Sequence, residues 1–233
     1  MYGLFFDPTM LIIIPGVIIA SIAQMKINTA YANYSKIANS KGLKGVDVAK
    51  SLLRIAGISD VQVEMVGGRL TDHYDPTKKV VRLSQDNYSG NSIASLSVAA
   101  HEVGHAIQHH YGYFPLTFRS TIAPIASFSS KFSWILITIG LIFGFMSSST
   151  ILLKIGIILF TAVVIFQIVT LPVEFNASKR ALEMLEEYSF LEKNEINGSR
   201  KVLGAAALTY VAAAVVGMLQ LLRLIVILNR RDD

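Results

Sequence analysis

The sequence predicts a mainly helical α+β protein in which a small polar domain with a short β-hairpin is joined to a bundle of four transmembrane helices. The membrane part follows from composition, because 52% of the 233 residues are hydrophobic and the mean hydropathy is +0.51, which is too apolar for an ordinary soluble domain. The polar part follows from a segment of alternating polar and apolar residues, after which comes a helix with the pattern His-Glu-x-x-His.

The charge balance and the lack of cysteine exclude several kinds of function. The net charge is +5, but no basic stripe with interleaved aromatic residues appears. We therefore attribute the positive charge to the orientation of a membrane protein and expect no nucleic-acid partner. The absence of cysteine excludes disulfides, thiolate zinc sites and cysteine nucleophiles.

Residues 1–26 are expected to form a first transmembrane anchor. Residues 8–25 carry no charge, and a run of that length can cross a bilayer. A cleaved signal peptide is the alternative. The residues before this run contain no Lys or Arg and Lys26 follows it directly, which favours an uncleaved anchor.

Residues 27–119 form the predicted polar domain. Its expected elements, taken from hydrophobic periodicity and turn residues, are a helix over 27–41, a helix over 45–56, a strand over 61–66, and two short strands over 69–74 and 79–83. A helix over 92–108 follows, with Asn91 or Ser92 as its cap and with Gly112 and Pro115 after its end.

The rest of the chain alternates between apolar and polar segments. Residues 120–173 are expected to contain the second and third transmembrane helices, with a tight turn over 147–149 between them. Residues 174–201 form a charged segment with a helix, and residues 202–233 hold the fourth transmembrane helix and a tail.

The distribution of basic residues predicts the orientation in the membrane. Residues 26–131 hold 12 of the 21 Lys and Arg residues, and residues 174–201 hold 5 more. Because basic segments stay on the cytoplasmic side, both should be cytoplasmic and both chain ends should lie outside.

The motif His101-Glu102-Val103-Gly104-His105 predicts a metal site. Two histidines four residues apart lie on one face of a helix, about one turn apart, so both can bind the same zinc ion. Zinc lowers the pKa of a bound water to about 7. The Glu102 carboxylate can take the proton of that water as it attacks a peptide carbonyl.

A catalytic zinc needs a third protein ligand. The remaining histidines are candidates: His73, His109 and His110. Glu174 is a further candidate because it ends the third apolar run, where a carboxylate is costly unless it is paired or bound to a metal. The alternative for Glu174 is a surface carboxylate paired with Lys179 or Arg180. Topology favours the ligand, since two spans separate Glu174 from the motif helix and return it to the same side.

Together these motifs resemble known membrane proteases. A His-Glu-x-x-His helix followed by Glu-Phe-x-Ala-(Asp/Ser) at a membrane boundary is similar to the HtpX-like and CAAX prenyl endopeptidase proteases, and closer still to the bacterial YugP-like neutral zinc metallopeptidases. The blocks that carry the resemblance are residues 72–76, 80–84, 99–108 and 171–178. It implies a zincin-like domain of the gluzincin type, with Glu174 as the third zinc ligand. Ser178 stands where the HtpX-like group has Asp, so it brings a hydroxyl without a charge.

Other residues are candidates for supporting roles. In zinc proteases of this build an edge strand before the motif helix usually holds the substrate as an added strand, and the candidates here are Val80, Val81, Arg82 and Leu83; an ordinary hairpin strand is the alternative. Asn176 and Ser178 could accept the outer N–H of a zinc-bound histidine. His73 is either a turn residue or a group that orients a ligand or stabilises the oxyanion. Three residues are further oxyanion candidates: Tyr74, Tyr111 and Arg180.

These features predict an integral-membrane zinc metallopeptidase with one Zn²⁺ per chain, in the bacterial cell membrane with its site facing the cytoplasm. Its partners would be the lipid bilayer and a peptide or protein substrate, such as a membrane-associated or misfolded protein. One alternative is a membrane scaffold that keeps the protease fold without activity. Another is an intramembrane protease of the site-two type. The ligands also suit Mn²⁺ or Fe²⁺.

Overall fold

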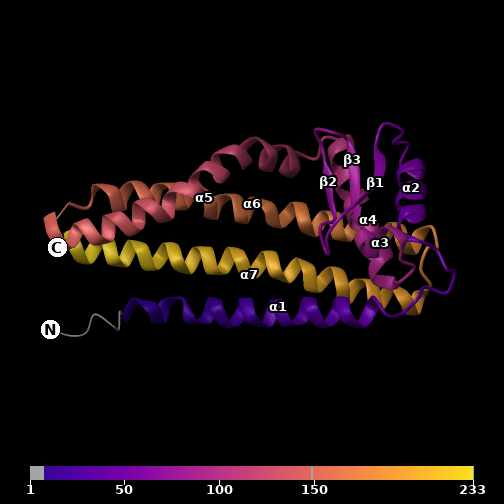
Figure 1. The fold of residues 1–233 in the computed structure, drawn as a ribbon, viewed down its shortest axis with the longest axis horizontal. Coiled ribbons are helices and arrows are strands. Elements are labelled where there is room, and N and C mark those ends of the chain that lie inside the picture. Colours follow the sequence, from indigo (N-terminus) through magenta and orange to yellow (C-terminus); the bar gives the residue numbers. More distant parts are fainter. Residues whose placement is uncertain (1–7, 148, 233) are drawn as a thin grey trace. The chain divides into compact units, whose positions relative to one another are not determined.

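A computed structural model of the chain describes residues 8–147 and 149–232 (Figure 1). After a short 3-10 helix over Pro8–Ile12, the helices are α1 (Ile14–Tyr34), α2 (Gly45–Ile55), α3 (Gln85–Ser89), α4 (Ile93–His110), α5 (Phe114–Ser147), α6 (Ile151–Glu187) and α7 (Lys193–Asp232). The strands are β1 (Gln62–Val66), β2 (His73–Asp75) and β3 (Val80–Ser84). The predicted turn over 147–149 includes residue 148, which lies outside the described residues.

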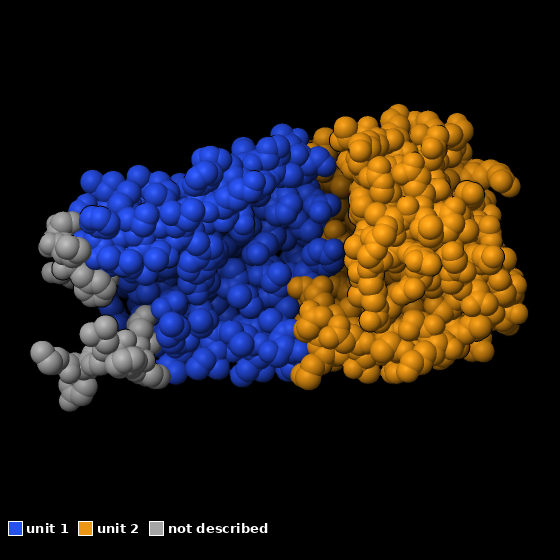
Figure 2. Space-filling view, viewed as in Figure 1, with its two compact units in different colours: residues 1–22, 118–171, 210–233 blue, residues 23–117, 172–209 orange. Residues whose placement is uncertain are grey.

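The chain divides into two compact units, which Figure 2 shows in different colours. Unit 1 contains residues 1–22, 118–171 and 210–233, and unit 2 contains residues 23–117 and 172–209. The long helix α6 contributes residues 151–171 to unit 1 and residues 172–187 to unit 2.

In its described part, unit 1 consists of helices, and two of them approach each other closely at glycines. A Cβ atom built on Gly140 of α5 would lie 2.5 Å from the backbone nitrogen of Leu153 on α6. A Cβ atom on Gly156 of α6 would lie 2.9 Å from the backbone nitrogen of Ile137 on α5. Small residues at helix crossings are typical of helices that pack within a membrane.

Three helices in the described chain are long and apolar enough to cross a membrane, not four. They lie at Phe114–Phe143, Ile151–Glu187 and Lys193–Arg230. The prediction of a four-helix transmembrane bundle is therefore wrong in its count. The topological argument for Glu174 depends on the first of these helices and on the part of the second that precedes Glu174, so the lower count does not affect it.

The N-terminal helix α1 is not among these three candidates. The apolar run of residues 8–25 is divided, because a 3-10 helix occupies Pro8–Ile12 and the α-helix begins only at Ile14. Helix α1 then continues through the polar residues Lys26, Asn28 and Asn33 to Tyr34. The helix predicted over 27–41 is therefore not a separate one: its first half is the end of α1, and residues 35–41 are not helical. The expectation that both chain ends lie outside depends on an even number of spans and stays a prediction.

Unit 2 contains a three-stranded sheet with the order β1-β3-β2. The predicted hairpin is confirmed, since β2 pairs with β3 in antiparallel register with Tyr74 opposite Val81. Strand β1 pairs with β3 in parallel register, with Gln62 opposite Val80. β3 is therefore the central strand, and the prediction that it is an edge strand is wrong.

Helix α4 lies in the core of unit 2. Leu96, Ala99, Ala100 and Val103 on this helix are fully buried among apolar residues of α2, β3 and α6. Its start is the predicted one, because the Ser92 side chain accepts a hydrogen bond from the Ser95 backbone N–H at 3.0 Å, which satisfies a free donor of the first turn. A helix fixed on several sides can hold its side chains in one orientation, which a binding site requires.

Candidate metal centre

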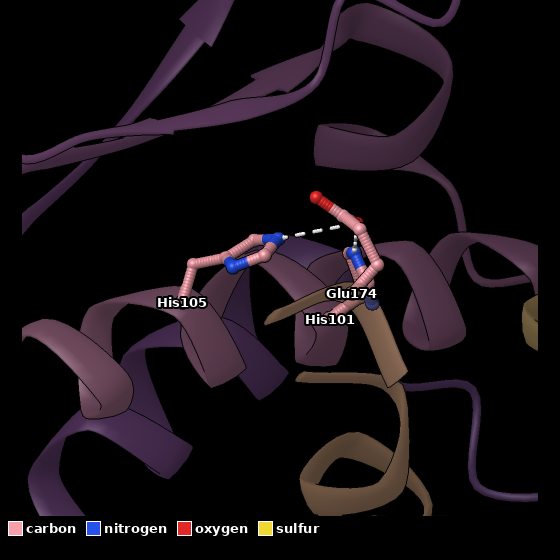
Figure 3. A group of neighbouring side chains, drawn as sticks. All are labelled: His101, His105 and Glu174. Atoms are coloured by element: carbon pink, nitrogen blue, oxygen red, sulfur yellow. Dashed lines mark ion pairs between the residues drawn. The ribbon is translucent and has the colours of Figure 1, made fainter. Parts of the chain in front are cut away.

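Three potential metal ligands meet in unit 2, two from α4 and one from α6. One ligand atom from each of His101, His105 and Glu174 lies within 4.8 Å of the others. The Glu174 Oε2 atom is 3.3 Å from His101 Nε2 and 3.7 Å from His105 Nε2 (Figure 3). Figure 3 shows the two imidazole rings and the carboxylate directed toward one another.

The spacing of these atoms fits zinc. Ligand atoms bound to one tetrahedral zinc at about 2.0–2.2 Å lie about 3.4 Å from each other. The two measured separations, 3.3 Å and 3.7 Å, are close to that value. Two imidazole nitrogens and one carboxylate oxygen are also a ligand set that catalytic zinc uses, with a fourth position left for water.

Glu174 is buried, which excludes the alternative of a surface carboxylate. Its side chain is 4% exposed, and it lies on α6 two residues after Pro172. Lys179 pairs with Glu183 and Arg180 donates to Asn176, so both cations that the alternative paired with Glu174 contact other residues. A buried carboxylate facing two histidines needs compensating positive charge, and a divalent cation supplies it.

Glu102 is also buried, and it lies on α4 between the two histidines. Burial raises the pKa of its carboxyl group above the usual range, although the neighbouring His101 and His105 oppose the effect. A raised pKa improves the match to a water molecule of pKa about 7, so this carboxylate is suited to act as a general base.

The histidines are held by hydrogen bonds to their outer nitrogens. The hydroxyl of Ser178, a predicted supporting residue, lies 3.2 Å from His101 Nδ1. The side-chain oxygen of Gln108 lies 3.0 Å from His105 Nδ1. Asn176, also predicted for this role, contacts Gln108 rather than a histidine. The sequence did not predict the role of Gln108. Its spacing of three residues from His105 allows the contact with the histidine, but not the contacts with α6.

The predicted substrate-binding strand must be corrected. The prediction concerned Val80, Val81, Arg82 and Leu83. Because β3 is paired on both sides, its backbone has no free edge for another strand. Val81 and Leu83 are fully buried, and the Arg82 side chain pairs with Glu64 and Asp75. The free edges of the sheet are those of β1 and β2.

The other predicted residues lie outside the three-residue group. His73 is exposed, with Nδ1 2.8 Å from the Thr71 carbonyl oxygen and Nε2 3.4 Å from Arg82. The hydroxyl of Tyr74 contacts His109 Nδ1 at 2.8 Å, and burial raises the pKa of Tyr74 to about 12, so this hydroxyl stays protonated. Tyr111 is 65% exposed. Among the described residues, the group of His101, His105 and Glu174 contains none of these.

Close contact between α4 and α6 makes Gly104 sensitive to substitution. A Cβ atom on Gly104 would lie 2.8 Å from the carbonyl oxygen of Ala177, so Gly104→Ala must push the two ligand-bearing helices apart. We expect it to destabilise the metal-free protein by about 1–3 kcal/mol, measured by thermal unfolding in detergent. Gly204→Ala is the matched control, because Gly204 is also helical and has nothing within 4 Å of its Cβ position. Equal losses in both variants would contradict the expected clash.

Comparison with known proteins identifies relatives of the chain that are described as proteases. Residues 9–229 match the model of a protein family described as "putative neutral zinc metallopeptidase". The chain is also 50% identical over 212 residues to the "putative membrane protease YugP" of Bacillus subtilis (strain 168), an alignment that covers 91% of this chain and 92% of that protein. No solved structure matches the chain.

Proposed function

Because the chain belongs to the family of putative neutral zinc metallopeptidases, we propose that it is an integral-membrane zinc endopeptidase with one Zn²⁺ held by His101, His105 and Glu174. The observation that carries the proposal is the meeting of two histidines on α4 with a buried carboxylate on α6. Helix α5 and the first part of α6 separate these residues in the chain, so their meeting is not a consequence of sequence proximity.

The proposed reaction is hydrolysis of a peptide bond by water. Zinc, when bound, supplies a Lewis acid and lowers the pKa of water. Glu102 takes a proton from the attacking water at its carboxylate and later donates it to the nitrogen of the leaving amine. The burial of Glu102 keeps bulk water away from this carboxylate, so that the proton stays available for the leaving group.

The substrate would be a polypeptide close to the membrane. We propose the cytoplasmic face of a bacterial cell membrane, because the two segments that supply the ligands lie within the basic parts of the chain. An extended peptide would add to the free edge of β2, which replaces β3 as the candidate strand. Membrane-associated and misfolded proteins contain extended segments of this kind.

Two alternative functions have less support than the zinc endopeptidase. A scaffold without activity would need no complete set of ligands and base, whereas this chain keeps all four residues. An intramembrane protease of the site-two type carries its motif within a span. Among the helices described, α4 is not one of the three candidate spans, which disfavours that alternative.

Removal of the metal tests the proposed function. We expect detergent-purified protein to contain about one zinc per chain and to cleave an unfolded or membrane-anchored test protein. A chelator should abolish cleavage, and added Zn²⁺ should restore it. Cleavage that persists in protein stripped of metal would refute the zinc mechanism. Zinc-loaded protein that cleaves none of the test proteins would favour the scaffold.

A further inference from the structure

A buried glutamine connects the two ligand-bearing helices. Gln108 is 0% exposed and lies on α4 just after the second histidine of the motif. Its side-chain oxygen is 3.0 Å from His105 Nδ1. Its side-chain nitrogen is 2.8 Å from the carbonyl oxygen of Val173 and 3.0 Å from Asn176 Oδ1, both on α6. One amide group therefore contacts the candidate ligand His105 and the backbone of Val173, which directly precedes the candidate ligand Glu174.

The direction of these hydrogen bonds is fixed by groups that can act in only one way. The carbonyl of Val173 can only accept, and Arg180, whose guanidinium can only donate, gives a 2.8 Å hydrogen bond to Asn176 Oδ1. Asn176 therefore presents its oxygen to Gln108. A reversed Gln108 amide would set its oxygen against two other oxygens, so its nitrogen must face α6 and its oxygen must face His105.

The oxygen of Gln108 requires a donor on His105. A neutral imidazole has one protonated nitrogen and one with a lone pair. With the proton on Nδ1, the lone pair is on Nε2, which is the nitrogen that lies 3.7 Å from the Glu174 carboxylate. The other tautomer would put an N–H where the metal binds and would set two acceptors against each other at Gln108.

We propose that Arg180, Asn176 and Gln108 form a hydrogen-bond relay that sets the tautomer of His105 and prepares Nε2 for the metal. Gln108 is the positioning residue of this relay, and its metal-binding consequence rests on the zinc site of the proposed function. Because Gln108 also holds α6 at Val173, directly before Glu174, it fixes the spacing between the two ligand-bearing helices. A purely structural role would require only the hydrogen bond to the Val173 carbonyl, whereas Gln108 also contacts His105.

Two substitutions separate this role from a purely structural one. Gln108→Met keeps the approximate volume but removes all three hydrogen bonds. Gln108→Glu keeps an oxygen that accepts from His105 Nδ1, but it loses the amide donor toward Val173 and Asn176. We expect Gln108→Met to weaken zinc binding about 10–100-fold, and Gln108→Glu to bind zinc within about threefold of the wild-type chain. Both should lower the thermal midpoint of the metal-free protein.

The experiment measures three quantities on full-length protein in detergent: the zinc dissociation constant by chelator competition, the thermal midpoint of the metal-free form, and the presence of a proton on His105 Nδ1 in that form by ¹³C and ¹⁵N NMR. Gln62→Met, at an exposed position of β1, is the matched control and should change none of them. Nδ1 of His105 should carry a proton in the wild-type chain and in Gln108→Glu, whereas in Gln108→Met a form without a proton on Nδ1 should appear.

Two results would overturn the proposal: zinc binding by Gln108→Met equal to that of the wild-type chain, or losses of affinity in both variants that follow their losses of thermal stability. A wild-type chain that binds no zinc would refute the proposed function instead. The relay would then still be decided by the state of Nδ1, since a wild-type His105 without a proton on Nδ1 would refute it.

Discussion

Glu102→Gln is expected to lower the rate of peptide hydrolysis by about 10²–10⁴-fold while the zinc content stays unchanged. The amide has nearly the size and shape of the carboxylate, so it fits the same buried position on α4. It cannot take a proton from water, however, and the attack on the peptide carbonyl loses its base. The measurement is kcat on a test protein, with zinc determined in the same preparation.

The control for this experiment is a glutamate of the same chain that lies away from the site. Glu183 is exposed on α6 and pairs with Lys179, so Glu183→Gln should keep full activity because exposed ion pairs contribute little. Full activity in Glu102→Gln would contradict the role of Glu102 as base. Loss of zinc in Glu102→Gln would instead make Glu102 part of the metal site.

The elements of the polar domain could be predicted because the signals for them are local. The apolar face of α2, the alternation in β1 and the serine cap of α4 each involve residues that are neighbours in the sequence. The order of the strands could not be predicted in the same way. Parallel pairing of β1 with β3 joins segments that are apart in the chain and depends on how α2 and α4 cover the sheet. Without that pairing, β3 looks like the end of a hairpin.

Hydropathy located the long helices but miscounted the spans. The apolar run at the N-terminus has the length of a span, but its fit to one depends on where the α-helix begins. The start at Ile14 leaves few apolar residues before Lys26, and only the structure gives that start. The later runs have no such break, and helices cover them.

The site was predictable to the extent that spacing determines geometry. The four-residue spacing of His101 and His105 fixes both side chains on one helix face. Glu174 lies far along the chain, so it was reached by counting spans and by resemblance. Gln108 was missed because its importance comes from Val173 and Asn176 on α6, which no local pattern connects to it.

Glu174→Ala is expected to reduce zinc binding by more than the 10–100-fold expected for a supporting residue such as Gln108. The substitution removes one of three ligands and leaves two neutral imidazoles, so both the charge and the geometry of the site are lost. The measurement is zinc per chain after dialysis against a weak chelator, with His101→Ala beside it as a second ligand variant that should behave in the same way.

The matched control is Glu183→Ala, which removes an exposed carboxylate from the same helix and should keep zinc at the wild-type level. Full zinc in Glu174→Ala would assign the third ligand to another residue and would separate the buried carboxylate from the metal. Loss of zinc in both ligand variants but not in the control would establish that α4 and α6 bind the ion together. The two helices would then be cross-linked by the metal, and the thermal midpoint of the wild-type chain should rise with zinc concentration, as mass action requires. Glu174→Ala should show no such rise, because a site that has lost a ligand cannot couple metal binding to the packing of α4 against α6.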